Sequence, residues 1–367
     1  MTTISERRTV IVTGIAGNLG TRLLPLLNEF EVIGLDLRPP SQPPQFRFEP
    51  IDLAEESSCR QLVTLLKETR AIAIVHLAFV IDPQRTGVLD VERMWQINVA
   101  GTARVMEAIS VVNRYGGNVR KFIFPSSVSA YGPETSGPIA EDFPLGAHTL
   151  PYAIHKQQSD EVVRYRTETL GECSTYILRP HIFTGASMQN YLVGALRGTP
   201  TGKGKRGERL RASGKRLPLM LPFGRSYPEK RYQFVHVDDM ARLLAHILHR
   251  DESSPETTIL NVAARGEPIT LARCAEIANA KVVRMPGRWA CRFVLRLLWN
   301  LGISAIPPQA LPYMIGSYTM DTTRLRKFLG RDYETVIRYT VEEALADSFR
   351  TESTQPQQME MAGQPQG

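Results

Sequence analysis

The chain has 367 residues, of which 43% are hydrophobic, 22% charged and 8% aromatic. These values are typical of a soluble globular protein and exclude disorder, collagen and coiled coil for most of the chain. A net charge of +7 would suggest a nucleic-acid or membrane partner if the charge were spread over the whole molecule. Here residues 197–231 hold 11 basic and two acidic residues, and the other 332 residues carry a net charge of −2. The excess therefore marks one basic segment, and we expect no nucleic-acid partner.

The four cysteines lie far apart with no Cys-x-x-Cys pair, so they predict neither a zinc site nor a disulfide framework. No other metal-ligating cluster is visible, and we expect no metal. The first residues, MTTISERR, contain no apolar segment, so no secretory signal is expected. The longest apolar run, residues 293–303, is interrupted by Arg296 and Asn300 and is too short to span a bilayer. These features predict reduced thiols and a cytoplasmic location.

Apolar runs of strand length alternate with helical patterns, such as residues 55–69 and 91–114, through the first half of the chain. The predicted strands are residues 9–13, 31–36, 46–51, 72–77, 121–126 and 174–179. Continuous apolar strands separated by helices indicate a parallel sheet that is covered on both faces. We therefore expect an α/β fold with a Rossmann-like, doubly wound parallel sheet.

The regular alternation stops after residue 184, returns at residues 233–265, and stops again. We expect residues 1–184 to form a Rossmann domain that residues 233–265 re-enter. Residues 185–232 and 266–350 would then form a smaller, mostly helical C-terminal substrate domain. The tail, residues 351–367, has no apolar periodicity and is expected to be disordered.

Three glycines, Gly14, Gly17 and Gly20, separate the first strand from a helix. This spacing allows a tight turn and close approach of the backbone to a pyrophosphate, which the N–H groups at the helix N-terminus stabilise. Asp36 follows 16 residues after Gly20, at the end of the second strand, where a carboxylate accepts hydrogen bonds from a ribose 2′-hydroxyl and repels a 2′-phosphate. The sequence therefore predicts NAD as cofactor, with nearby Arg38 leaving NADP open.

The spacing Gly-x-x-Gly-x-x-Gly resembles the extended short-chain dehydrogenase/reductases, the NAD-dependent epimerase/dehydratase family. Further motifs of that family follow in order from residue 9 to 349: Asp52-Leu53, His76-Leu77-Ala78, Asn98 to Thr102, Ser126 to Gly132, Tyr152 to Lys156, Leu178-Arg179-Pro180 and Phe234 to Asp239. The resemblance implies that the cofactor-binding domain is residues 1–184. It also implies that the cofactor is bound by Gly14, Gly17, Asn18, Leu19, Gly20, Asp36, Asp52, Leu53, Ala78, Asn98, Tyr152, Lys156, Pro180 and His181.

Tyr152 and Lys156 are four residues apart and share one face of a predicted helix. A phenol with a pKa of about 10 needs a nearby positive charge to act as a base at neutral pH. The ammonium of Lys156 and an oxidised nicotinamide ring would supply that charge, and Lys156 would also hold the nicotinamide ribose. Tyr152 would then take the proton of a substrate hydroxyl as hydride leaves the same carbon. The resemblance places Ser127 where it would hydrogen-bond the reacting oxygen.

The stretch Ser127-Val128-Ser129 lacks the acidic residue of the family's dehydratases, which argues against a 4,6-dehydratase. A UDP-sugar 4-epimerase needs only removal of hydride, rotation of the keto sugar and return of hydride, and it is our first prediction. However, Ile182 stands where many members have a sugar-contacting Asn, and Tyr232-Gln233 where they have Arg-Asp. These departures keep open an NAD(P)-dependent dehydrogenase or reductase of a less polar alcohol, similar to 3β-hydroxysteroid dehydrogenases.

A third interpretation, from another class, is a non-catalytic NAD-binding scaffold or redox sensor. The presence of Ser127, Tyr152 and Lys156 argues against it. His236 is expected to have a structural role, with Asp238 and Asp239 capping the helix that follows. The resemblance also implies a homodimer, formed through a helix pair that includes the helix of Tyr152.

Two basic features lie outside these motifs. Residues 203–216, KGKRGERLRASGKR, are expected to form a solvated mobile loop, and the alternative is a lid that attracts an anionic small-molecule substrate. The second is a basic amphipathic helix: Arg288, Trp289, Arg292, Phe293, Arg296, Leu297 and Trp299. We expect its apolar face to pack onto its own domain rather than onto a membrane surface.

Overall fold

Seven parallel strands form the main sheet of this computed structural model, which describes residues 7–40, 44–81, 90–135, 137–251 and 254–350. In spatial order the strands are β11 (Thr257–Val262), β6 (Ser174–Pro180), β5 (Lys121–Pro125), β4 (Ala73–His76), β1 (Arg8–Thr13), β2 (Phe30–Asp36) and β3 (Arg47–Pro50). The order reverses direction between β1 and β4, as in a doubly wound sheet. The α/β fold predicted from the sequence is confirmed.

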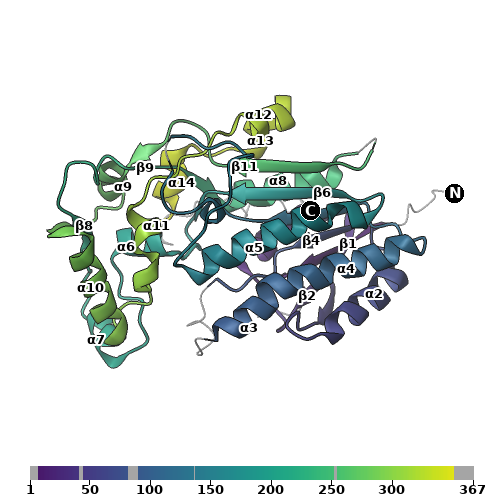
Figure 1. Cartoon of the computed structure of the whole chain (residues 1–367), viewed down its shortest axis with the longest axis horizontal. Helices are drawn as coiled ribbons and strands as arrows, with labels where there is room; N and C mark the ends of the chain where they lie inside the picture. Colours follow the sequence, from purple (N-terminus) through teal and green to yellow (C-terminus); the bar gives the residue numbers. More distant parts are fainter. Residues whose placement is uncertain (1–6, 41–43, 82–89, 136, 252–253, 351–367) are drawn as a thin grey trace, which may run out of the picture.

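Helices cover both faces of the sheet, which explains why its strands are apolar throughout. In β1, Val10 and Val12 face the layer of α1 (Asn18–Leu23) and α8 (Val237–His249), while Ile11 faces the opposite layer. The opposite layer consists of α2 (Ser57–Thr69), α4 (Gly101–Arg114) and α5 (Pro151–Arg166). Figure 1 shows α4 and α5 crossing in front of the strands.

The helix predicted over residues 91–114 contains an internal change of winding. It begins as α3 (Val91–Trp95), passes through a π-helical turn (Gln96–Ala100) and continues as α4. Asn98 lies in the π turn, a type of distortion that is found mostly at functional sites.

In the described part of the chain, three two-stranded sheets lie outside the main sheet. They pair β7 (Ile182–Thr184) with β10 (Phe234–His236), β9 (Arg231–Tyr232) with β12 (Ile269–Thr270), and β8 (Leu219–Pro222) with β13 (Val282–Met285). After residue 232 the chain first forms β10, which pairs with β7. It returns to the main sheet only with β11. Of the carboxyl-terminal helices, α12 (Thr323–Leu329) packs on β11 and α13 (Tyr333–Val336) on α8.

A second group of elements forms what we call the peripheral unit, at the left of Figure 1. It comprises β8, β13, α6 (Tyr191–Arg197), α7 (Lys205–Ala212), α9 (Leu271–Ile277), α10 (Gly287–Asn300) and α11 (Leu311–Ile315), and it packs with α14 (Val341–Asp347) around a shared apolar core. The prediction of a loop at residues 203–216 is wrong for its middle part, because Lys205–Ala212 form α7.

The caps predicted for α8 are also wrong. The helix begins at Val237, and the ring of His236 accepts the hydrogen bond of the Asp238 N–H. Asp238 instead pairs with Arg22 of α1, and Asp239 accepts hydrogen bonds from the N–H groups of Arg338 and Tyr339.

Among the described residues, no helix is long and apolar enough to cross a membrane. No group of three or more His, Cys, Asp or Glu side chains in this part of the chain is arranged to hold a metal ion. The four cysteines, which all lie in the described ranges, form no disulfide, and three of them are buried.

Candidate active site

A cleft of about 380 Å³ lies between the carboxyl ends of β5 and β6 and the peripheral unit. Ligands of doubly wound sheets bind at this edge, beside the point where the strand order reverses. The lining includes four of the residues predicted for the site: Ser127, Tyr152, Pro180 and His181. Residues far apart in the chain therefore converge on one concave surface.

Ser127 follows β5 in extended conformation and begins a short 3₁₀ turn, Val128–Tyr131. Its Oγ accepts hydrogen bonds from the Ser129 N–H at 3.1 Å and from the Ser129 hydroxyl at 2.9 Å. With both acceptor positions of Ser127 used, its own proton is left for another acceptor in the cleft. Ser129 therefore orients the Ser127 hydroxyl, which lies in the same cleft wall as the Tyr152 phenol.

Tyr152 and Lys156 lie on α5, which Pro151 starts at a position where its missing N–H costs nothing. The Lys156 ammonium is buried and donates a hydrogen bond to the Pro125 carbonyl at 2.6 Å. It also lies 3.6 Å from the centre of the Phe79 ring, whose edge contacts Tyr152. The Phe79 ring therefore covers one side of the Lys156 ammonium.

Burial dominates the electrostatics of this group. Removal from water lowers the pKa of Lys156 to about 7, and nearby Asp160 opposes this shift. Burial also raises the pKa of Tyr152, while the hydrogen bond from Ser127 lowers it. A cation close to the phenol would reverse the effect of burial and make Tyr152 a better base.

The predicted glycine turn is tightly packed. Gly14 has φ +70°, and a Cβ there would lie 2.6 Å from the Ala78 nitrogen. A Cβ on Gly20 would lie 2.5 Å from the Ile15 carbonyl oxygen, so α1 can pack against the turn only with glycine at this position. Gly17 is the N-cap of α1 and no side chain caps this helix end. Such a turn lets a pyrophosphate approach the backbone.

The Asp36 carboxylate lies at the end of β2 beside this turn. It accepts hydrogen bonds from the Ala16 N–H at 3.1 Å and from the Leu37 N–H at 2.8 Å. Both oxygens keep capacity for a further donor, because each carboxylate oxygen accepts two hydrogen bonds. The position and chemistry of Asp36 fit a ribose diol, and the residues of the turn fit a dinucleotide.

The other predicted cofactor residues make contacts within the protein. Asp52 pairs with Arg93, and Leu53 is buried against Gly101. Asn98 holds the backbone of Val80 through both its amide groups, at 2.7 and 2.9 Å. The two residues beside the glycines, Asn18 and Leu19, begin α1, where Asn18 bonds to Ser187 and Leu19 is partly buried.

His76 connects the glycine turn to the helix of Asn98 through a chain of hydrogen bonds. The Thr102 hydroxyl donates to the Asn98 carbonyl, so its oxygen accepts the proton of His76 Nε2. The Thr13 oxygen accepts from the Ala78 N–H and lies 2.7 Å from His76 Nδ1, to which its hydroxyl proton can be donated. A neutral ring satisfies both contacts, and burial lowers its pKa to about 3.

Pro180 ends β6, and His181 follows it in the wall of the cleft. His181 Nδ1 accepts from the Ile182 N–H at 2.8 Å, and Nε2 donates to the Tyr318 carbonyl at 2.9 Å. Its ring stacks on Tyr318, and burial lowers its pKa to about 4. His181 is thus a neutral wall of the cleft and is not placed to carry a proton.

Sequence reasoning missed three groups that shape the site. Phe79 covers Lys156, and Ser129 orients Ser127. Arg179 is fully buried and forms a two-pronged ion pair with Asp160 of α5, at 2.8 and 2.9 Å, which fixes the catalytic helix to β6. Arg179 and Ser129 both stood in recognised motifs, but their partners could not be identified without the fold.

The residues that depart from the family pattern have internal partners. Ile182 lines the cleft, while Tyr232 is fully buried and donates to the Met314 carbonyl at 2.8 Å. The Gln233 amide exchanges two hydrogen bonds with the backbone of Met320. Neither Tyr232 nor Gln233 therefore replaces a cationic contact to a diphosphate.

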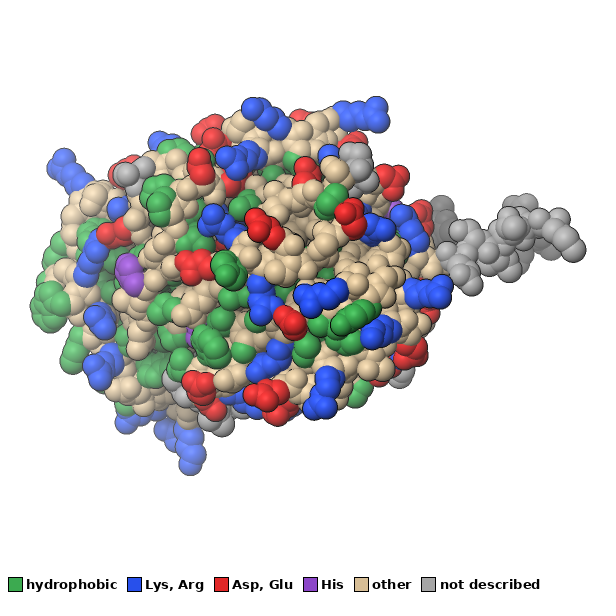
Figure 2. Space-filling view, turned by 45° about the vertical axis from the view of Figure 1, so that its right-hand side comes forward, with side chains coloured by type: hydrophobic (Ala, Val, Ile, Leu, Met, Phe, Trp, Pro, Cys, Tyr) green, Lys and Arg blue, Asp and Glu red, His purple; other side chains and the backbone are tan. Residues whose placement is uncertain are grey.

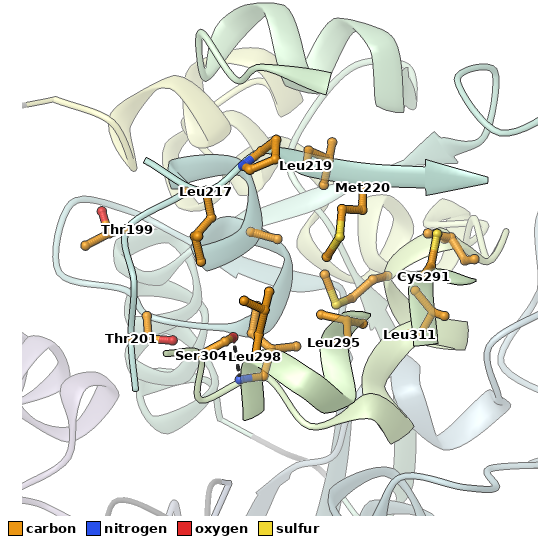
Figure 3. A pocket seen from close by; sticks show the side chains of 17 residues that line it. Thr199, Thr201, Leu217, Leu219, Met220, Cys291, Leu295, Leu298, Ser304 and Leu311 are labelled. Carbon is orange, nitrogen blue, oxygen red and sulfur yellow. Dashed lines mark hydrogen bonds between the residues drawn. The ribbon is translucent and has the colours of Figure 1, made fainter. Parts of the chain in front are cut away.

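A small apolar pocket of about 40 Å³ adjoins the cleft in the peripheral unit and shares Gly194, Thr201, Ile306 and Met314 with it. Figure 3 shows its side chains converging, with Leu217, Leu219, Met220 and Leu295 on the apolar side and Thr199, Thr201 and Ser304 at one edge. The inner end of the cleft is therefore apolar.

Comparison with known proteins places these features in one family. Residues 10–263 match the sequence model of the NAD dependent epimerase/dehydratase family. The UDP-glucose 4-epimerase of Bacillus subtilis (strain 168) is 29% identical over 252 residues, which are 63% of this chain and 70% of that protein. An uncharacterized epimerase/dehydratase of Staphylococcus saprophyticus is 22% identical over 166 residues, 44% of this chain and 49% of that protein.

Solved structures share the fold. The UDP-glucose 4-epimerase of Thermus thermophilus, in complex with NAD, superposes with a TM-score of 0.64 at 20% identity, covering 94% of this chain and 99% of that one. MoeE5 in complex with UDP-glucuronic acid and NAD gives 0.61 at 21% identity, with 93% and 97% covered. The chain therefore belongs to the NAD-dependent epimerase/dehydratase family, the extended short-chain dehydrogenase/reductases, and is an enzyme that uses NAD.

Proposed function

We propose that this enzyme transfers a hydride between NAD and a secondary alcohol or ketone that binds in the cleft. The observation that carries the proposal is that Ser127 and Tyr152 line the same cleft wall, with Lys156 one helical turn from Tyr152. A substrate oxygen that bonds to both hydroxyls has its carbon held in a fixed orientation. Bound NAD would accept or return the hydride and supply the positive charge of its oxidised ring.

Each of the three side chains has a distinct task in this proposal. Tyr152 removes the proton of the substrate hydroxyl during oxidation and returns it during reduction. Ser127 donates to the same oxygen and stabilises its developing negative charge. Lys156 stabilises the Tyr152 phenolate through its charge, which the low dielectric of the buried site makes more effective.

The lining of the cleft favours a substrate of low polarity, and our first candidate is a dehydrogenase or reductase of such an alcohol or ketone. Lys203 is the only charged side chain among the described residues that line the cleft. Aromatic and aliphatic side chains dominate the remainder, among them Ile182, Phe183, Met188, Leu192 and Met314. A diphosphate would need several cationic or N–H partners in such a cleft, since a buried anion without partners is strongly disfavoured.

A second candidate, UDP-sugar 4-epimerisation, is favoured by the names of the similar proteins. The reaction needs the same three side chains, because hydride leaves and returns to one carbon. Its nucleotide would have to lie along the edge of the cleft near Lys203, the one charged side chain among the described lining residues.

One assay separates the two candidates. The purified enzyme with NAD is offered 3β-hydroxysteroid-type alcohols in one series and UDP-glucose and UDP-galactose in the other, and NADH is followed by its near-ultraviolet absorbance. Accumulation of NADH with the apolar alcohols supports the first candidate, and interconversion of the UDP-sugars without net NADH supports the second.

The variant Tyr152→Phe tests the reaction type for either substrate. We expect it to lower kcat by at least a hundredfold, the range typical of losing a general base, with NAD affinity little changed. The matched control is Tyr165→Phe, an exposed tyrosine on the same helix. Retained activity of Tyr152→Phe would contradict the proposed mechanism.

A further inference from the structure

Helix α10 carries apolar side chains on two opposite faces. Ala290, Cys291 and Leu295 are buried against the peripheral unit. On the other side Trp289, Phe293 and Leu297 follow at every fourth position and are 69%, 64% and 46% exposed. The expectation that these three residues pack onto their own domain is therefore wrong, because other residues of the same helix fill that contact. A continuous stripe of large exposed apolar side chains marks an interaction surface.

The stripe has a basic border on its own helix. Arg292 and Arg296 are exposed and lie three residues after Trp289 and Phe293, respectively, which places them beside the stripe. Among the described residues, neither arginine forms an ion pair with a carboxylate, whereas Arg288 pairs with Glu134. The two arginines are therefore available for an anionic partner.

Helix α7 is held close to the end of α10 by glycines. The Gly204 N–H donates to the Gly302 carbonyl and the Gly202 N–H to the Ile303 carbonyl, both at 2.9 Å. A Cβ on Gly202 or Gly207 would lie 2.2 or 2.7 Å from the Gly302 oxygen, so side chains there would push the two helices apart. The basic segment is thereby fixed beside the amphipathic helix.

Exposed cations continue along α7 and the turn after it. Lys205, Arg206, Arg209 and Lys215 are exposed, and none of them has an ion pair within the described part of the chain. Lys and Arg side chains project from the lower edge of the molecule in Figure 2, the edge where Figure 1 places α7. We call the α10 stripe, its two arginines and these four cations the α7–α10 surface.

We propose that the α7–α10 surface docks on an anionic lipid membrane. Trp, Phe and Leu side chains insert at the boundary between headgroups and acyl chains, while Arg and Lys side chains bind lipid phosphates. A second copy of the chain fits this surface poorly, because a two-fold contact would bring the same cations of both copies together. A nucleic acid would leave the apolar stripe exposed to water.

The proposed docking surface adjoins the active site. Thr201 and Lys203, which line the cleft, directly precede α7, while Ala305 and Ile306, which also line it, follow α10. A substrate of low polarity dissolved in the bilayer would thus find the cleft beside the docking surface. Docking itself does not depend on which substrate the enzyme uses.

Vesicle binding tests the proposal with the whole chain. The protein is sedimented with vesicles of phosphatidylcholine alone or of phosphatidylcholine with phosphatidylglycerol at a 3:1 ratio. We expect at least tenfold tighter binding to the anionic vesicles at low salt, weakening as salt rises. Tryptophan emission should shift to shorter wavelength on binding, since Trp289 leaves water.

Two combined variants separate the apolar and electrostatic contributions. Trp289→Ser, Phe293→Ser and Leu297→Ser together should weaken binding to anionic vesicles at least tenfold and remove the emission shift. Lys205→Gln, Arg206→Gln and Arg209→Gln together should weaken it by a similar factor and reduce its salt dependence. The matched control is Tyr165→Ser on α5, where the side chain is 87% exposed and distant in the chain from α7 and α10. NAD binding by every variant verifies the fold.

Three outcomes would overturn the proposal. The first is no preference of the wild-type chain for anionic vesicles. The second is unchanged binding by the variant that lacks the apolar stripe. The third is a wild-type dimer in sedimentation equilibrium that becomes a monomer in that variant without any vesicle binding, which would make the surface a contact between copies.

Discussion

At the residue scale, the direction of the Ser127 proton depends on Ser129. The Ser129 N–H and hydroxyl both donate to Ser127 Oγ, so the Ser127 hydroxyl keeps its own proton for another acceptor in the cleft. Ser129 does not need to touch a substrate to act in this way. It is a positioning residue, and the acidic residue of dehydratases would not reproduce its effect because an ionised carboxylate cannot donate.

The variant Ser129→Ala should lower kcat on the order of tenfold, equivalent to about 1.4 kcal/mol of transition-state stabilisation, with little change in KM. Loss of the ordered Ser127 donor raises the pKa of Tyr152, so the rise of kcat with pH should move to higher pH. Steady-state kinetics across pH 6–10 measure both effects. Ser129→Thr, which keeps the hydroxyl, should restore the profile, and an unshifted profile for Ser129→Ala would exclude the positioning role.

The buried pair of Arg179 and Asp160 gives a prediction on stability. Both side chains are 0% exposed, and Arg179 also donates to the Tyr131 hydroxyl and the Glu141 carbonyl. Asp160→Asn leaves the guanidinium charge without its counter-ion and should cost about 3–5 kcal/mol in the free energy of unfolding, measured by urea denaturation. The exposed Asp142→Asn serves as control, and a loss of stability equal to that control would contradict a strong internal pair.

At the element scale, the turn between β1 and α1 has no space for a side chain at Gly14. Gly14 combines a left-handed φ with an approach to the backbone of Ala78. Gly14→Ala must separate β1 from the segment after β4, and the backbone N–H groups of the turn move with it. We expect NAD affinity to fall at least tenfold, measured by calorimetric titration.

The control for this prediction is Gly116→Ala. Gly116 has a similar φ of +84°, but a Cβ there meets nothing within 4 Å. Gly116→Ala therefore has the same cost of placing alanine at a left-handed φ, about 1 kcal/mol, but no clash between its Cβ and the backbone of another segment. Equal loss of NAD affinity in both variants would attribute the effect to general destabilisation rather than to the glycine turn.

The main strands and helices were predictable because each follows a local pattern. The apolar runs of β1, β2, β5 and β6 and the four-residue spacing of Tyr152 and Lys156 are both visible in the sequence. The caps of α8 were not, because Asp239 finds its partners 99 and 100 residues away. The exposure of Trp289, Phe293 and Leu297 could not be predicted either, since α10 carries apolar residues on two faces and the sequence does not show which face is buried.

At the scale of the whole molecule, the cofactor end of the sheet is connected to the cleft through α1. Asn18 and Arg22 both bond to Ser187, in the segment between β7 and α6. Met188 and Gln189, which follow Ser187, line the cleft. A dinucleotide that rests on α1 would therefore also fix the segment that shapes the substrate cleft, which only the folded chain brings together.

The neutral state of His76 makes the stability of the whole chain depend on pH. The pKa of this ring is about 3 in the folded chain and about 6.5 when unfolded, so the unfolded chain binds one more proton between these values. Its contribution is complete above pH 6.5 and is lost as pH falls toward 3. Between pH 6.5 and 4 this amounts to about 3 kcal/mol, since each pKa unit corresponds to about 1.4 kcal/mol.

His76→Asn removes the titrating group but keeps one acceptor for Thr13 and one donor for Thr102. The free energy of unfolding of the wild type should therefore fall by about 3 kcal/mol more than that of the variant between pH 6.5 and 4. Urea denaturation at several pH values measures the difference. His148→Asn, at an exposed histidine, is the control and should leave the slope close to that of the wild type. If His76→Asn and the wild type lose stability in parallel, the ring is protonated in the fold, and the hydrogen-bond chain from Ala78 to Asn98 must run in another direction.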